Sequence, residues 1–140
     1  MSTTTHDTRD GREIADVVVT SFGYGHSPAP EADLTLDARR HLRNPHHDPA
    51  MRTLTGLDRV VREHVLATPG AQATITTAIT FARDLHAQVN GQRLVTIAVG
   101  CVGGRHRSVA IAAEVVAGLN ACGLDALVAH RDVGRPVIQT

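Results

Sequence analysis

The chain has 140 residues, a formal net charge of zero at pH 7 and two cysteines. This length suits a single domain with its own buried core, and the balanced charge argues against strong attraction to nucleic acid or acidic membranes. Lysine is absent and all fixed cations are arginines, which excludes Schiff-base catalysis and a lysine-dependent phosphate loop.

The cysteines and aromatic residues narrow the class of protein further. Cys101 and Cys122 fit neither a disulfide framework nor a Cys-x-x-Cys metal pair. The sequence carries no signal peptide and no membrane-length apolar run, so we expect a cytoplasmic protein without membrane contact. Phe22, Tyr24 and Phe81 are the only aromatic residues, which argues against a base-stacking surface.

The beginning of the chain predicts a leader followed by one domain. Residues 1–13 open with polar, unpatterned sequence and are expected to be a disordered leader, residues 14–133 a single domain, and residues 134–140 an irregular tail. Residues 15–21 are rich in β-branched side chains and predict a buried strand. Residues 32–37 alternate weakly and predict a second strand. The irregular segment over 44–56 is a candidate functional loop.

The rest of the chain alternates helices and strands. Helices are predicted over 56–67, with Thr55 as its cap and Asp58 in its first turn, over 71–89, and over 109–122 with its opening near Arg107 and Ser108. Strands are predicted over 94–99 and 126–129. This pattern indicates an α/β fold with a small, mostly parallel sheet of about four strands flanked by helices. Binding sites in such folds lie at the carboxyl ends of the strands.

Residues 100–108 join the clearest strand to the last long helix and read Gly-Cys-Val-Gly-Gly-Arg-His-Arg-Ser. Gly103 and Gly104 allow a tight turn that brings backbone N–H groups close to a ligand. The opening of the helix adds unpaired N–H groups and a partial positive charge. Arg107, Ser108 and a protonated His106 are further donors. The sequence therefore predicts an anion site in this loop.

The same loop leaves a catalytic alternative open. Residues 101–108 fit Cys-x-x-Gly-x-x-Arg-Ser, the pattern of cysteine-based phosphatases, in which a thiolate attacks phosphorus while arginine holds the oxygens. Cys101 and Arg107 would carry that chemistry, close to a helix N-terminus that favours a thiolate. A general acid is also required, and Asp48 and Asp132 are the candidates. Gly100 departs from the pattern, because those enzymes usually have histidine there.

Other polar residues have simpler interpretations. The run of His46, His47 and Asp48 invites a metal, but adjacent residues point in different directions and no third ligand spacing is evident, so we expect no metal and no cofactor. Residues 130–132 read either as a strand end with solvated charges or as the edge of a pocket. Cys122 is expected to be a small buried hydrophobe.

The loop belongs to a longer, ordered set of motifs that resembles the C-terminal domain of the RNase adapter protein RapZ. The signature Gly-Cys-Thr-Gly-Gly-x-His-Arg-Ser-Val of that family is close to residues 100–109. The other matching segments, which occur in family order, are Ser21-Phe22-Gly23-Tyr24, Asp37-Ala38-Arg39, Asn44-Pro45-His46, Asp48-Pro49, Thr55-Gly56-Leu57-Asp58 and His130-Arg131-Asp132.

The resemblance implies a regulatory α/β domain of bacterial origin that binds the amino-sugar phosphate glucosamine-6-phosphate without catalysis, that binds small RNAs in some members and that forms oligomers. The family's pocket residues can be carried over to the matching positions of this sequence. At the phosphate end of the pocket, the resemblance implies Cys101, Val102, Gly103, Gly104, His106, Arg107 and Ser108. Asp37, Arg39 and His46 are implied to close it from facing loops.

The sequence departs from this family at several points. Val102 replaces the common threonine, one residue is inserted between Arg39 and His46, and residues 134–140 lack the basic end that serves RNA binding. We expect the family's N-terminal kinase-like domain to be missing, so a separate kinase-like or other protein partner is a further possibility. RNA binding is the weaker expectation, because it needs clustered cations. We expect a phosphorylated small-molecule ligand and a homo-oligomer.

Overall fold

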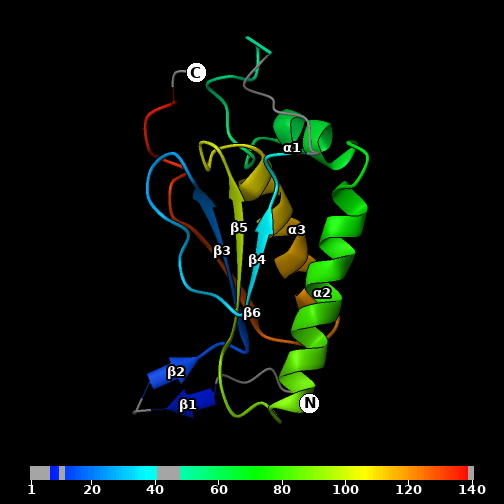
Figure 1. Ribbon diagram of the computed structural model, residues 1–140. Helices are drawn as coiled ribbons and strands as arrows, with labels where there is room; N and C mark the ends of the chain where they lie inside the picture. Colours follow the sequence, from blue (N-terminus) through cyan, green and yellow to red (C-terminus); the bar gives the residue numbers. More distant parts are fainter. Residues whose placement is uncertain (1–6, 10–11, 41–47, 139–140) are drawn as a thin grey trace.

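The computed structural model describes residues 7–9, 12–40 and 48–138. Its centre is a four-stranded sheet with the order β4-β5-β3-β6, in which all neighbouring strands are parallel (Figure 1). The strands are β3 (Val17–Gly23), β4 (Leu34–Asp37), β5 (Val95–Cys101) and β6 (Ala126–His130). The prediction of an α/β fold with a small parallel sheet is confirmed.

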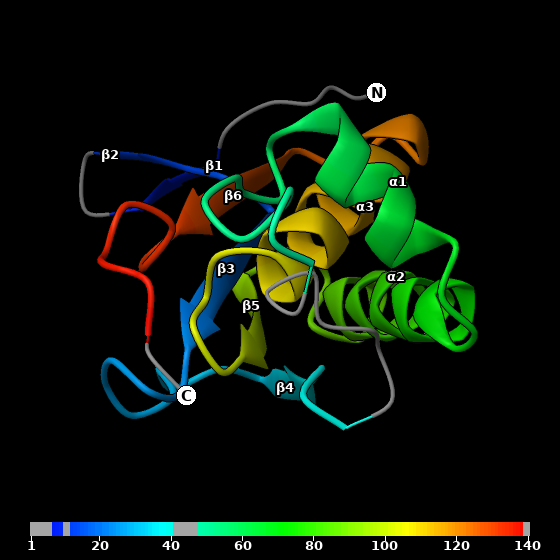
Figure 2. The same ribbon diagram turned by 90° about the horizontal axis from the view of Figure 1, so that it is seen from above.

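Three helices cover one face of this sheet (Figure 2). They are α1 (Arg59–Leu66), α2 (Ala71–Gln88) and α3 (Arg107–Ala121). The core lies between them and the sheet, and its largest fully buried side chains include Ile97, Ile111 and Leu119. α3 is apolar almost all round because it packs on the sheet and on both other helices.

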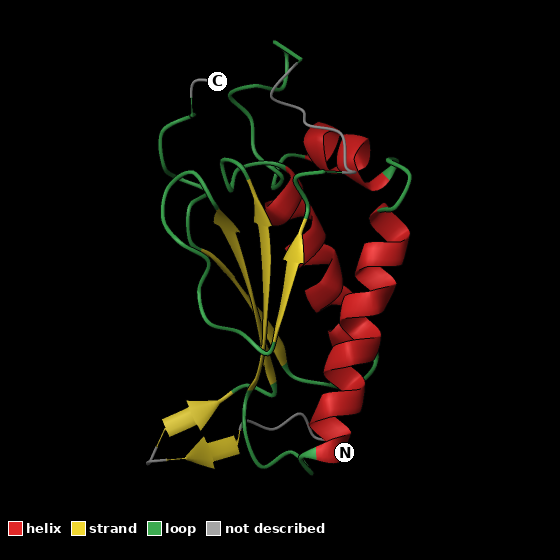
Figure 3. Cartoon of the chain, viewed as in Figure 1, coloured by secondary structure: helices red, strands yellow, loops and turns green. Residues whose placement is uncertain are grey.

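The start of the chain differs from the expected leader. Two short strands, β1 (Asp7–Arg9) and β2 (Arg12–Ile14), pair in antiparallel fashion with Asp7 opposite Ile14. This hairpin lies beyond the amino ends of the sheet strands (Figure 3). These strands are defined by their paired backbone groups and not by an apolar pattern. Hydrophobic periodicity in the sequence therefore did not predict them. At the other end, residues 134–138 form neither helix nor strand.

Most predicted elements lie within two or three residues of their observed bounds, and α1 shows why one boundary differs. This helix begins at Arg59, with Asp58 and not Thr55 as its N-cap residue. Thr55 instead starts the turn before it: its Oγ1 accepts the N–H of Leu57, and the carboxylate of Asp58 accepts the N–H of Thr55. The prediction that Thr55 caps the helix and Asp58 lies in its first turn is therefore wrong.

Two further features complete the fold. Cys122 is exposed, which corrects the expectation that it is buried, because it lies at the C-terminal end of α3 where the chain leaves the core. Among the described helices, none combines the length and the apolar character needed to cross a membrane.

Candidate functional site

The site lies where the carboxyl ends of the parallel strands meet. Gly23 ends β3 opposite Cys101 at the end of β5, and Asp37 ends β4 opposite Gly100. In Figure 2 the loop from β5 to α3 passes over this end of the sheet. A parallel sheet brings its strand ends to one edge, so segments far apart in sequence become neighbours here.

Glycines allow the loops at this edge to pack backbone against backbone. A Cβ atom at Gly104 would lie 2.5 Å from the backbone nitrogen of Gly23, and one at Gly23 would lie 2.4 Å from the carbonyl carbon of Gly103. Gly104 also has φ +69, a conformation that other residues adopt at a cost. The spacing of these glycines therefore reflects close packing of the loop against β3 as well as access for a ligand.

The loop offers backbone donors to a ligand. In the part of the chain that the structure describes, the backbone N–H groups of residues 103–105 donate no hydrogen bond. The 15-residue helix α3 begins directly after them, with His106 as its N-cap residue and no side-chain cap. Its first turn adds the positive end of the helix dipole. This arrangement is suited to an anion.

Arg107 is a buried cation beside this loop. The residue is only 3% exposed. Its Nη1 donates to the carbonyls of Ala38 and Arg39 at 3.2 and 2.9 Å. Burial lowers the pKa of Arg107, whereas the nearby Cys101 and Asp37 act in the opposite direction. The surroundings thus disfavour the charge that a bound anion would stabilise.

Cys101 and Ser108 contact each other across the start of α3. The Cys101 thiol donates to Ser108 Oγ at 3.2 Å, and both residues are buried. Cys101 also interacts directly with Arg107. The turn of the loop thus brings the thiol, the hydroxyl and the guanidinium together, although the sequence separates the first from the others by several residues.

Asp37 and Arg39 form the wall of the site on the β4 side. Arg39 donates from Nε and Nη2 to the two oxygens of Asp37 at 2.9 and 2.7 Å. The Arg39 guanidinium also stacks 3.7 Å above the ring of Tyr24. These hydrogen bonds lower the pKa of Asp37 against the opposing effect of burial, and the charge of Arg107 lowers it further. Asp37 is therefore ionised and held in place at neutral pH.

Two arginines hold the loops together through hydrogen bonds to backbone carbonyls. Arg105 donates from Nε to the Leu54 carbonyl at 3.0 Å and from Nη2 to the Thr53 carbonyl, so it ties the glycine loop to the segment before α1. His106 is buried, and its Nε2 lies 3.0 Å from the carbonyl oxygen of Met51 in the same segment.

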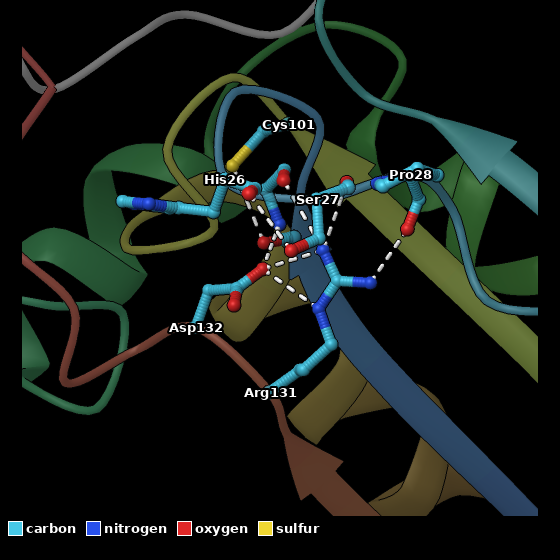
Figure 4. A network of polar contacts seen from close by, with 8 residues as sticks. His26, Ser27, Pro28, Cys101, Arg131 and Asp132 are labelled. Atoms are coloured by element: carbon cyan, nitrogen blue, oxygen red, sulfur yellow. Dashed lines mark hydrogen bonds and ion pairs between the residues drawn. The ribbon is translucent and has the colours of Figure 1, made fainter.

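The second of these arginines is Arg131, which follows β6 (Figure 4). It donates to the carbonyls of Pro28, Ser27 and Gly23 at 2.7, 3.0 and 3.3 Å. The buried carboxylate of Asp132 accepts the Gly23 N–H at 2.7 Å and Arg131 Nε at 2.9 Å. Asp132 is thus buried and Arg131 partly buried, and both hold the loop after β3 in place.

The charge state of Asp132 follows from these contacts. Burial raises its pKa, but the hydrogen bonds from Arg131 and Gly23 and the Arg131 charge outweigh burial and lower the pKa overall. A carboxyl group with a lowered pKa is a poor proton donor, which argues against Asp132 as a general acid. Asp48, the other candidate, is exposed and accepts the N–H of Ala50 in a turn.

The structure places most of the predicted site residues at one edge of the sheet. Those in the loop or at the start of α3 are Cys101, Val102, Gly103, Gly104, His106, Arg107 and Ser108, and Asp37 and Arg39 lie beside them. His46 and His47 lie outside the described residues, and no cluster of potential metal ligands occurs among the described ones. Sequence reasoning assigned no role to Tyr24 or Arg105, which carry no periodic signal.

Comparison with known proteins places the chain among curated relatives. It is 44% identical over 129 residues to a nucleotide-binding protein of Thermobifida fusca and 48% identical over 126 residues to one of Leifsonia xyli. The matches cover 91% and 86% of this chain but only 43% and 42% of the relatives' length. A nucleotide-binding protein of Rhodospirillum centenum is 44% identical over 135 residues, which cover 94% of this chain and 40% of that protein.

The family assignment agrees with the motifs and with the fold. The RapZ C-terminal domain matches residues 15–134, which span the whole sheet, all three helices and the glycine loop. On this match and on the relatives' identity, the chain belongs to the RapZ C-terminal domain family.

Proposed function

We propose that this domain is a regulatory sensor that binds a phosphorylated small metabolite without converting it. The observation that carries the proposal is the buried Arg107 at the start of α3, beside backbone N–H groups that have no acceptor among the described residues. A phosphate group there would accept hydrogen bonds from the loop and offset the positive charge of Arg107. Its oxygens are matched by the guanidinium fork.

The finer proposal is an amino-sugar phosphate such as glucosamine-6-phosphate. Such a ligand carries a phosphate and an ammonium group a few bonds apart. The site likewise places a cation, Arg107, within electrostatic reach of an anion, Asp37. The ion pair between Asp37 and Arg39 is partly exposed, so Asp37 is accessible to a positively charged group of the ligand. The two opposite charges of the site therefore favour a ligand that carries both charges over a simple sugar phosphate.

Isothermal titration calorimetry with glucosamine-6-phosphate tests the proposal. Arg107→Ala is expected to weaken binding by about 1.5–3 kcal/mol, the contribution of a hydrogen bond to a charged group. Arg59→Ala is the matched control, because Arg59 lies on the exposed face of α1 and pairs with Glu63. Absence of binding to the wild-type protein at about millimolar ligand would disprove the sugar-phosphate proposal.

Glucose-6-phosphate and inorganic phosphate extend the same titration. If the ammonium group is recognised through Asp37, glucose-6-phosphate binds more weakly than the amino sugar, and Asp37→Asn removes that difference. Equal affinity for the two sugars in the wild type would contradict the role given to Asp37 and leave only the phosphate subsite. A preference for inorganic phosphate over both sugars would contradict the sugar part of the proposal.

A cysteine-dependent phosphatase is a second candidate, favoured by the contact between Cys101 and Ser108. The Cys101 thiolate would attack phosphorus and expel the alcohol, which takes a proton, and water would then release phosphate from sulfur. That scheme needs a protonated carboxyl group, but the pKa of Asp132 is lowered, and Asp48, the other candidate, is exposed and accepts the N–H of Ala50. Hydrolysis of an aryl phosphate that Cys101→Ser abolishes would establish this activity, and inactivity on all phosphate esters tested would dismiss it.

RNA binding is the remaining alternative. It predicts a gel shift with structured RNA that weakens as salt rises. The zero net charge of the chain argues against it, and a separate kinase-like or other protein partner remains equally a prediction. RNA binding and a protein partner both leave the expected ligand titrations unchanged, since in each case the pocket is a regulatory site.

A further inference from the structure

Residues 24–28, the loop after β3, hold two peptide groups of the glycine loop in a fixed direction. The Tyr24 N–H donates to the Cys101 carbonyl, and the Gly25 N–H donates to the Val102 carbonyl, each at 2.9 Å. In a trans peptide, the carbonyl and the N–H that follows it point in opposite directions. The two N–H groups that follow these carbonyls therefore point away from the loop after β3.

One of these two N–H groups belongs to Gly103, where the glycine loop is open. A Cβ atom at Gly103 would have no neighbour within 4 Å, and within the described part of the chain the Gly103 N–H donates no hydrogen bond. At the other end of the loop, the Gly56 N–H donates to the Arg105 carbonyl at 2.8 Å. Because these carbonyls are bonded to neighbouring segments, the loop can turn N–H groups toward an anion, whose oxygens only accept hydrogen bonds.

The loop after β3 is itself held at both ends by two residues that follow β6. Arg131 donates to three of its carbonyls, as far along as Pro28 (Figure 4), and its guanidinium carbon lies 5.2 Å from the centroid of the Phe22 ring. Asp132 accepts both the Gly23 N–H and Arg131 Nε through one oxygen, Oδ2. A chain of contacts therefore runs from the end of β6, through the loop after β3, to the peptide groups of the glycine loop.

We propose that Arg131 and Asp132 are positioning residues for the phosphate site. They act through the loop after β3, which aims N–H groups of the glycine loop at the anion, and not on the ligand itself. The inference rests on the phosphate-binding function proposed above. Donors that already point at the ligand need no ordering when it binds, so their fixed direction increases the affinity.

The charges of these two residues separate positioning from simple electrostatics, because the two effects have different signs. A carboxylate near a bound anion repels it, so by charge alone Asp132→Ala strengthens phosphate binding. By positioning, the same substitution weakens binding, since the Gly23 N–H and Arg131 lose their acceptor. Arg131→Lys keeps the positive charge but loses the planar fork that reaches several carbonyls. By charge alone this variant binds phosphate as the wild type does, whereas by positioning it binds more weakly.

Asp33 offers a matched control at the opposite end of the sheet. It directly precedes β4, and its Oδ2 accepts the Thr96 N–H at 2.8 Å and Arg93 Nη1 at 3.1 Å. These contacts are of the same kind as those of Asp132, a backbone N–H and an arginine, but they lie at the amino ends of the strands. Asp33→Ala is therefore expected to lower the stability of the fold without changing phosphate binding.

NMR spectroscopy of the isotope-labelled full chain tests the inference. Titration with inorganic phosphate, followed at the amide signals of Gly103 and Gly104, gives the dissociation constant. Asp132→Ala and Arg131→Lys are each expected to raise this constant about tenfold or more, through the loss of charge-assisted hydrogen bonds. Asp33→Ala is expected to leave it within about twofold of the wild-type value.

Hydrogen exchange of the Tyr24 and Gly25 amides, measured without phosphate, is a second readout that does not depend on binding. Both amides are expected to be protected in the wild type and to lose protection in Asp132→Ala and Arg131→Lys, but not in Asp33→Ala. If the wild type binds no phosphate, the proposed function fails and this readout alone decides the positioning role.

Three results would overturn the inference. The first is unchanged protection of the Tyr24 and Gly25 amides in both variants of the residues that follow β6. The second is a phosphate affinity that is unchanged or higher in Asp132→Ala. The third is an equal loss of affinity or protection in Asp33→Ala, which would show that any destabilised fold has the same effect.

Discussion

Gly103 and Gly104 are adjacent in the loop, but the structure predicts opposite consequences for replacing them with alanine. At Gly104 the backbone has φ +69, and an added Cβ would lie 2.5 Å from the Gly23 nitrogen and 2.9 Å from Asp132 Cβ. The left-handed conformation costs a residue other than glycine about 1–2 kcal/mol, and forced overpacking costs about 1–3 kcal/mol. Gly104→Ala is therefore expected to lower the free energy of unfolding by about 2–5 kcal/mol.

Gly103→Ala is the matched control for this prediction. A Cβ at Gly103 would have no neighbour within 4 Å, and its φ is not positive. The free energy of unfolding is therefore expected to stay within about 0.5 kcal/mol of the wild-type value. The open space is on the loop that offers its N–H groups to an anion, so we expect the added methyl group to weaken binding of a phosphorylated ligand.

Urea unfolding followed by circular dichroism measures both variants. For a domain of this size the slope is about 1–3 kcal/mol per molar urea, so Gly104→Ala is expected to lower the midpoint by about 1 M or more, with the slope unchanged. If Gly104→Ala unfolds at the wild-type midpoint, the close packing of the loop on β3 is wrong. If Gly103→Ala is destabilised as much as Gly104→Ala, the loss reflects glycine in general and not the contact with Gly23.

Three further predictions concern the polar network. Because the folded-state pKa of Asp132 is lowered, its carboxylate stabilises the fold above the ordinary value of 3.8, and this contribution is lost as the pH falls through the folded-state pKa. Asp132→Asn should lower the free energy of unfolding by about 1–3 kcal/mol at neutral pH. In urea titrations it should also reduce the loss of stability at acid pH, and an unchanged acid dependence would contradict this. Burial also lowers the pKa of His130, whose Nδ1 lies 2.6 Å from Ser21 Oγ. The unfolded chain therefore binds a proton more readily, and stability should fall as the pH drops below 6.5, a slope that His130→Asn should reduce in melting experiments. Arg105→Met should lower the free energy of unfolding by about 1–3 kcal/mol through loss of the Leu54 and Thr53 carbonyl partners, whereas Arg59→Met, on an exposed pair, should change it by less than about 1 kcal/mol.

The sequence by itself determined the fold class and the centre of the site. β-branched runs, helical periodicity and the glycines after residue 99 are local signals, because each depends on neighbours within a few residues. These local signals were sufficient to predict the strands of the sheet, the helices α1 to α3, and the loop around Arg107. The ordered motifs added the family, and with it Asp37 and Arg39, which no local rule singles out.

Only the tertiary structure decided which polar residues belong to the site and which hold the fold together. Arg131 and Asp132 resemble solvated charges in sequence, but β6 carries them against the loop after β3, where they bond to its backbone. Arg105 is separated by about fifty residues from the carbonyls that it binds. Such contacts depend on the order of strands in the sheet, and strand order has no signature in the residues of any one strand.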